Sequence, residues 1–381
     1  MTIKKSSLNL YIYYTAILMQ VITINYESSG MISYLKYIVC LIGISYSFSL
    51  MCSESNCKRF MKKEMKRILM VPVFFLIISL LKIGQTNISS SRIINEIMFM
   101  VLPILYAYGL INTLKYKQIE KAMFGTLLIS FVGYILNVGL NPIDFVRALA
   151  NMNFGASESI LESSQFAGTA IAVALYYLYY RRNKIGFFLS IMFVILTFKR
   201  LAIVVVIVLL FLPKVLDLTV PVKKNLFRFI CLFVFFAGVV YFQLMLPENK
   251  EIVRHYFGSG FDKFTMSRYW RFSLIYDNPS YFNYGLGSTY DFLMERYNFT
   301  LEMDICKLLM EVGYVAVFFF IYQYFYSVKR NLYCTVLMGY LFLNMITSHC
   351  LASMFTWIIV FLTVGTIQFI EPNGVKPVVK I

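Results

Sequence analysis

Residues 184–212 read KIGFFLSIMFVILTFKRLAIVVVIVLLFL and place two adjacent cations, Lys199 and Arg200, near the middle of a long apolar run. As one straight helix, residues 185–212 would extend about 42 Å, whereas the hydrocarbon core of a bilayer is about 30 Å thick. Basic residues flank both ends of the run, and such residues collect on the cytoplasmic side of membrane proteins. We therefore expect the run to cross a membrane twice and to turn at residues 197–200, on the external side.

The composition of the whole chain is also typical of a membrane protein. Hydrophobic residues make up 59% of the 381 residues and charged residues 14%, whereas soluble domains average about half apolar and about a quarter charged. In a soluble protein the formal charge of +16 would favour nucleic acid as a partner, but in a membrane protein Lys and Arg set the topology. We therefore expect no nucleic-acid partner. The seven cysteines and two histidines show no metal-binding spacing, so no metal site is expected.

Apolar runs of membrane-spanning length predict an all-α polytopic membrane protein with about 12 transmembrane helices. The expected spans are residues 8–24, 32–51, 68–84, 93–114, 122–140, 165–180, 185–198, 201–213, 226–246, 305–326, 332–348 and 351–370. The basic connections alternate along the chain, which predicts cytoplasmic N- and C-termini. The chain then divides into residues 1–246 with nine spans, a long extracytoplasmic loop at 247–304, and residues 305–381 with three spans and a cytoplasmic tail.

The long loop brings cations and aromatic rings to the expected external side. Its candidate ligand-binding side chains are Arg254, Arg268, Tyr269, Trp270 and Arg271. Arginine binds phosphate through two parallel hydrogen bonds, and Tyr and Trp offer a flat apolar face with a polar group. The alternative is an interfacial belt of aromatic rings with arginines that extend to the lipid headgroups. Lys199 and Arg200 form a second external pair, and a charge held at membrane depth usually has a partner or a function.

Further polar and glycine positions extend from the loop into the next expected span. They are Gly285, Gly287, Glu302, Asp304, Lys307 and Glu311. The two glycines predict a tight turn with a close backbone approach to a ligand or to another helix. Asp304, Lys307 and Glu311 share one helical face, where Asp304 is a candidate base and Lys307 a candidate phosphate or carboxylate ligand. The alternative is a set of internal ion pairs that holds this helix in the bundle; Glu96, in the fourth span, is open to the same two interpretations.

Four short features follow one another between residues 165 and 313. They are a helix turn with Arg (Thr197-Phe198-Lys199-Arg200), a triplet followed by aromatic residues (Met266-Ser267-Arg268-Tyr269-Trp270), Gly285-Leu286-Gly287, and a helix from Glu302-Met303-Asp304 to Glu311-Val312-Gly313. In order and spacing they resemble the O-antigen and capsule repeat-unit polymerases (Wzy-type), which are related to the O-antigen ligases. Ser267 replaces the Gly of the family's [Ser/Thr]-Gly-Arg triplet. The His-Asn of the ligases is absent at residues 302–304, which favours a polymerase, and neither His255 nor His349 matches a motif position.

The resemblance implies a GT-C-like, metal-independent glycosyltransferase of the bacterial inner (cytoplasmic) membrane, without a cofactor. Its donor would be a growing glycan on undecaprenyl pyrophosphate and its acceptor a lipid-linked oligosaccharide repeat unit. Membrane lipid, a flippase and a chain-length regulator are its other expected partners. The alternative functions are a flippase or transporter of lipid-linked oligosaccharide and a related O-antigen ligase.

The resemblance also implies roles for individual side chains. Arg200 and Arg268 would stabilise the charge of the departing pyrophosphate, while Asp304, and after it Glu302, would accept the proton of the acceptor hydroxyl. The expected substrate-binding residues are Lys199, Arg254, Arg271, Tyr269, Trp270, Gly285, Gly287 and Lys307.

Overall fold

The structure is a computed structural model, and it describes residues 5–26, 31–53, 59–139, 163–197, 199–257, 265 and 267–370. These residues form helices and turns and contain no strand. The chain divides into two compact units. Unit 1 consists of Met1–Lys62, Leu102–Thr219 and Ser353–Ile381, and unit 2 of Lys63–Val101 and Val220–Ala352. Each unit therefore combines segments that are far apart in the sequence.

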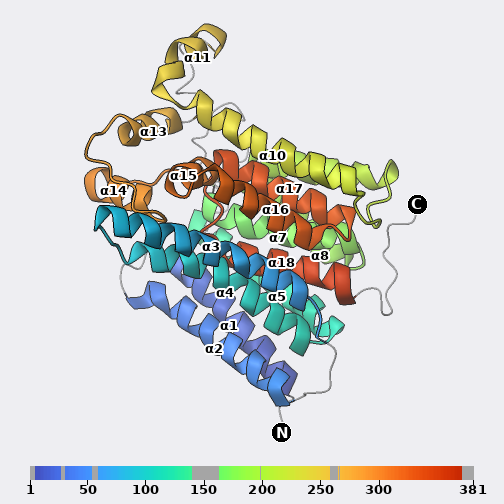
Figure 1. Cartoon of the computed structure of the whole chain (residues 1–381). Coiled ribbons are helices and arrows are strands. Elements are labelled where there is room, and N and C mark those ends of the chain that lie inside the picture. The colour runs from blue at the N-terminus through green and yellow to red at the C-terminus, as the bar shows by residue number, and fades with distance from the viewer. Residues whose placement is uncertain are drawn as a thin grey trace. The chain divides into compact units, whose positions relative to one another are not determined.

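Unit 1 is built around two buried helices. Its helices are α1 (Lys5–Asn25), α2 (Met31–Ser53), the second part of α4 (Arg92–Thr113), α5 (Tyr116–Val138), α7 (Ser164–Tyr180), α8 (Lys184–Leu196), α9 (Arg200–Phe211) and α18 (Met354–Gly365). All residues of α18 are buried, and α18 packs against α7 (Figure 1). A Cβ atom at Gly168 of α7 would lie 2.5 Å from the Thr356 Oγ1 of α18, so this glycine allows the two helices to approach closely.

Unit 2 has a core of aromatic side chains. Its helices are α3 (Lys62–Thr86), the first part of α4, α10 (Lys224–Leu244), α11 (Lys250–Phe257), α13 (Arg268–Tyr276), α14 (Ser288–Tyr297), α15 (Asp304–Glu311), α16 (Tyr314–Val328) and α17 (Leu332–Thr347). Phe320 of α16 meets Phe75 of α3 edge to face at 5.9 Å between ring centroids, and lies 4.9 Å from Phe342 of α17. These buried contacts hold the helices that carry the candidate site.

Several helices have the length and surface of membrane-spanning segments. Among the described residues, six helices are long and apolar enough to cross a bilayer: α1, α2 (from Tyr34), α3, α4, α5 and α10. Their outer faces carry large apolar side chains, such as Leu80 and Leu81 on α3, which are 56% and 65% exposed. An apolar surface of this kind is stable against lipid rather than water. The helices are thus those of a multi-pass membrane protein.

The apolar run at residues 184–212 is divided into two helices, as its length predicted. It forms α8 and α9, with Thr197 and Lys199 as the adjoining cap residues, while Phe198 lies outside the described residues. The helix is interrupted within the expected span at 305–326: α15 ends at Glu311 and α16 starts at Tyr314. Gly313 between them has a φ of +84°, which a continuing right-handed helix does not allow.

Candidate functional site

A buried, hydrogen-bonded polar site lies in unit 2, where α15 begins. Asp304, the first residue of α15, is fully buried, and its Oδ1 lies 2.8 Å from Nδ1 of His349. Its Oδ2 accepts the backbone N–H groups of Cys350 and Leu351, both at 2.6 Å. The carboxylate therefore fixes both the imidazole and the connection that follows α17. With Nδ1 held by a carboxylate, the free ring nitrogen is Nε2, and the His349 side chain is 30% exposed.

The two partners of this pair shift each other's pKa in opposite directions. Burial alone would raise the pKa of the Asp304 carboxyl, but the charge of His349 and the three hydrogen bonds outweigh it and hold that pKa below its ordinary value. The Asp304 carboxylate raises the pKa of His349 above its ordinary value, against the opposing effect of burial. A carboxylate that is fully hydrogen-bonded with a lowered pKa is a weak base, whereas an oriented imidazole can take up a proton near neutral pH.

Two arginines share one carboxylate two residues before Asp304. Arg268 Nη2 lies 3.2 Å from Glu302 Oε2, and Arg271 Nη1 lies 3.3 Å from Glu302 Oε1. The Glu302 side chain is 43% exposed, while those of Arg268 and Arg271 are 13% and 25% exposed. Nε of Arg268 is buried and has no acceptor among the described residues. The cluster carries one net positive charge and an unused donor, so it can bind a further anionic group.

The arginine cluster begins at a residue with an unusual backbone conformation. Ser267, which precedes α13, has a φ of +60°, in the left-handed region that glycine adopts without a Cβ penalty. This is the position where the polymerase triplet has Gly. Met266, its neighbour in the motif, lies outside the described residues.

A second cluster of charges is buried between α4 and α15. Lys307 Nζ lies 2.8 Å from Glu96 Oε1, and both side chains are at most 4% exposed. The same Glu96 oxygen receives Arg92 Nη2 at 2.8 Å. The carboxylate thus links α15 to α4, and the cluster keeps one net positive charge. Sequence reasoning left Glu96 and Lys307 open between a site and an ion pair that holds the bundle, and in the structure they are joined to each other.

Glu311, at the other end of α15, is also fully buried. Its Oε1 accepts the backbone N–H of Thr289 at 3.0 Å and the Thr289 hydroxyl at 2.6 Å, while Oε2 has no partner among the described residues. Lys82 of α3 donates to the Glu311 backbone oxygen at 2.8 Å, close to the break before α16.

The two glycines of the loop allow close contacts within unit 2. Gly285 and Gly287 have φ values of +104° and +86°. A Cβ at Gly285 would lie 2.5 Å from Ser79 Oγ on α3, and one at Gly287 would lie 2.5 Å from Arg92 Cγ on α4. The sequence predicted a close backbone approach either to a ligand or to another helix, and the structure contains the approach to other helices.

The other expected site residues lie as follows. Tyr269 is buried in α13, Trp270 is 49% exposed, and Arg254 is exposed on α11. Lys199 and Arg200 belong to unit 1, where they lie at the start of α9 and Arg200 is exposed. Within the described ranges, no three His, Cys, Asp or Glu side chains come together as metal ligands would.

His349 is the functional candidate that sequence reasoning missed. It follows α17 on the expected external side, and Asp304 begins the expected tenth span on that same side, so the predicted topology alone could have paired them. No protein-family model, curated protein or solved structure matches this chain.

Proposed function

We propose that the protein is a membrane glycosyltransferase of the repeat-unit polymerase type, which joins lipid-pyrophosphate-linked oligosaccharides at the external membrane face. The observation that carries the proposal is the joint presence, at the start of α15, of an imidazole oriented by Asp304 and an arginine pair with a spare donor. A base and a phosphate-binding cation are the two groups that this transfer needs. The resemblance described above supplies the substrate class.

The proposed step transfers the growing glycan from its lipid to the incoming repeat unit. Nε2 of His349 takes the proton of an acceptor hydroxyl, whose oxygen forms a bond to the anomeric carbon of the donor sugar. The bond from that carbon to the pyrophosphate oxygen breaks, and the lipid pyrophosphate leaves with the electron pair. Arg268 and Arg271 stabilise the charge that develops on it, which lowers the energy of the transition state more than that of the ground state.

The geometry shifts the proposed base from Asp304 to His349. Both Asp304 oxygens are already engaged by His349 and by two backbone N–H groups, so the carboxylate acts by positioning the imidazole. Glu302 is held between two guanidinium groups, which makes it a weak base and suits it to keep the arginines in place until a phosphate binds. The roles that the resemblance implies for Lys199 and Arg200, which belong to unit 1, stay predictions.

The test is a reaction of purified protein with a lipid-pyrophosphate-linked repeat unit, followed by separation of products by size. Wild type should yield a ladder of lengthened glycans, and Arg268→Ala, Arg200→Ala and His349→Gln should each lower the rate about 100-fold or more. Lys250→Ala, which removes an exposed cation of α11, is the matched control and should keep the wild-type rate. Normal ladders from both arginine variants would overturn their proposed roles.

One observation favours transport as a second candidate function. Helix α15 stops before Gly313 with Lys307 and Glu311 buried, and transporters commonly bind substrates at interrupted helices. Sealed vesicles separate the two functions. Accumulation of the unchanged lipid-linked unit in the opposite leaflet indicates a transporter, and a new glycosidic linkage indicates a transferase.

A further inference from the structure

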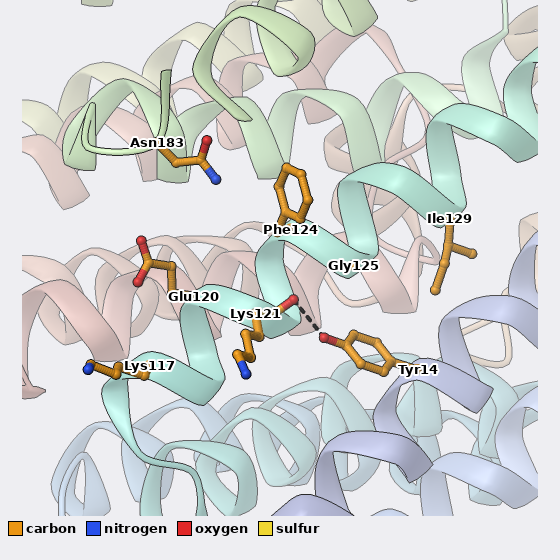
Figure 2. Close-up of a pocket in the computed structure, with 8 residues that line it drawn as sticks. All are labelled: Tyr14, Lys117, Glu120, Lys121, Phe124, Gly125, Ile129 and Asn183. Carbon is orange, nitrogen blue, oxygen red and sulfur yellow. Dashed lines mark hydrogen bonds between the residues drawn. The ribbon is translucent and has the colours of Figure 1, made fainter. Parts of the chain in front are cut away.

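A pocket in unit 1 is distinct from the site at α15. It has a volume of about 570 Å³ and is lined by Tyr14, Lys117, Glu120, Lys121, Phe124, Gly125, Ile129 and Asn183. These residues come from α1, α5 and the connection between α7 and α8 (Figure 2). The volume lies within the range of about 300–1,000 Å³ found for small-molecule sites.

The polar and apolar linings of the pocket are separated along α5. Lys117, Glu120 and Lys121 occupy the first turns of this candidate membrane span, and Phe124 and Ile129 follow deeper in the helix. Ile129 lies 12 residues beyond Lys117, which is about 18 Å along an α-helix. A charged end followed by an apolar wall has the order of a phospholipid, whose headgroup lies at the interface and whose chains point into the bilayer.

The two lysines of the pocket are only partly balanced by the charge of Glu120. Neither Lys117 nor Lys121 forms a side-chain ion pair or hydrogen bond with another residue that the structure describes. The first turn of α5 contains no acidic residue, so the positive end of the helix dipole adds to their charge. With Glu120 included, the lining carries one net positive charge, which favours an anionic headgroup over a zwitterionic one.

One wall of the pocket is held in place by α1. The Tyr14 hydroxyl donates to the backbone oxygen of Lys121 at 2.7 Å, the bond drawn as a dashed line in Figure 2. A Cβ at Gly125 would lie 2.4 Å from the Tyr14 ring, so the glycine leaves room for that ring against α5. The pocket therefore has a fixed wall and is more than a row of surface lysines.

Asn183 adds an oriented hydrogen-bond donor. Its Oδ1 accepts the backbone N–H of Gly186 at 3.0 Å and caps α8, which leaves the amide Nδ2 group for a ligand. Figure 2 shows this amide beside Phe124, with its nitrogen directed toward Phe124 and Glu120. A phosphate or ester oxygen is the acceptor that such a donor would meet in a lipid headgroup.

We infer that this pocket binds one anionic phospholipid, with its phosphate at Lys117, Lys121 and the Asn183 amide and an acyl chain along Phe124 and Ile129. Glu120 lies where it can accept a hydrogen bond from a headgroup hydroxyl, which makes phosphatidylglycerol the best-suited probe. The inference does not depend on the proposed transferase reaction, because no residue of the pocket belongs to the site at α15.

The experiment is a titration of the full-length protein in detergent with phosphatidylglycerol, read by native mass spectrometry as the fraction with one bound lipid. Each lysine near a membrane surface contributes about fivefold to anionic-lipid affinity. Lys117→Gln with Lys121→Gln should therefore weaken binding about 25-fold. The pair Lys223→Gln with Lys224→Gln removes two exposed cations outside the pocket and should leave the affinity unchanged.

Asn183 gives a test that preserves the fold. Asn183→Asp keeps an oxygen acceptor for the α8 cap but replaces the amide donor with a negative charge, so lipid binding should fall. Asn183→Ser keeps the cap without the charge and should bind more tightly than the Asp variant.

Two ligand comparisons identify the occupant. Phosphatidylcholine with the same chains should bind at least about tenfold more weakly than phosphatidylglycerol. Glycerol 3-phosphate, which lacks chains, should not displace the lipid. The proposal is overturned by equal retention of phosphatidylglycerol in wild type and the lysine pair variant, by equal binding of phosphatidylcholine, or by displacement with glycerol 3-phosphate.

Discussion

Replacing Asp304 with Asn tests the Asp304–His349 pair by changing one carboxylate oxygen to an NH₂ group. The Asn oxygen can still accept the N–H groups of Cys350 and Leu351, while its NH₂ group must face His349 Nδ1. Nδ1 can accept this donor only if the ring proton moves to Nε2, which then cannot serve as a base. We expect Asp304→Asn to lower the transfer rate about 100-fold to 10,000-fold while the protein remains inserted and folded.

The cost in stability follows from the three bonds to Asp304. In wild type the acceptor of each bond is a charged carboxylate, whereas in the variant both groups are neutral. Each bond is thereby weakened by about 1 kcal/mol, which makes about 3 kcal/mol in total. The lowered pKa of Asp304 means that its contribution is complete above the unfolded-state value of about 4 and is lost as pH falls through the folded-state pKa. The raised pKa of His349 gives a contribution that is complete below about pH 6.5 and is lost as pH rises through the folded-state pKa. The stability difference between wild type and variant should therefore be largest between about pH 4 and pH 6.5.

Histidine NMR provides the assay, because the chain contains only two histidines. In ¹⁵N-histidine-labelled protein, a His255→Gln variant assigns the His349 signals. The wild-type His349 pKa should lie above about 6.5, the ordinary value, and should fall in Asp304→Asn, with the proton on Nε2 in the neutral ring. A His349 pKa at or below that value in wild type, or an unchanged tautomer in the variant, would refute the reasoning.

Three further predictions concern unit 2. Lys307→Met should cost about 1–3 kcal/mol of unfolding free energy in chemical denaturation, because Glu96 loses one of its two cationic partners and keeps Arg92. Adding Glu96→Met should lower the stability further, because Arg92 then loses its carboxylate; a double variant more stable than the single one would contradict this. Gly285→Ala should lower the melting temperature more than Gly313→Ala, because both have positive φ but only Gly285 has a neighbour within 4 Å of the added Cβ; equal losses would mean that crowding is unimportant. Ser267→Gly should retain transfer activity and stabilise the protein by about 1 kcal/mol, measured by thermal unfolding, since it relieves a left-handed Ser; a loss of stability would show that the Ser side chain matters more than backbone strain.

The helical class of the protein and the division of residues 184–212 into two helices could be predicted from the sequence. The length of residues 184–212 and the basic residues at both ends require a break near Lys199, and α8 and α9 meet there. These are local features, since helix length and flanking charge can be read from consecutive residues. The same reasoning did not predict the break at Gly313, because one glycine in an apolar run does not reveal whether its φ will be positive.

The pairings in the site depend on contacts between distant segments. Asp304 and His349 are 45 residues apart, and Lys307 meets Glu96 across helices that are not neighbours in the chain. Residue spacing predicted only that Asp304, Lys307 and Glu311 share a face, whereas the structure gives each a partner from a different segment. The expected loop at 247–304 also contains α11, α13 and α14, whose short amphipathic segments are less evident in a sequence than long apolar runs.

The central claim is that an imidazole oriented by a carboxylate and a neighbouring pair of arginines transfer a glycan away from a lipid pyrophosphate. The most direct measurement is the pH dependence of product formation by purified wild type and His349→Gln from a defined lipid-pyrophosphate-linked repeat unit. We predict a wild-type ladder whose rate of formation rises as pH passes through the raised pKa of His349, and a slow, pH-independent rate in the variant. Ladders of equal rate and pH dependence from both proteins, or no new linkage with wild type, would contradict the account.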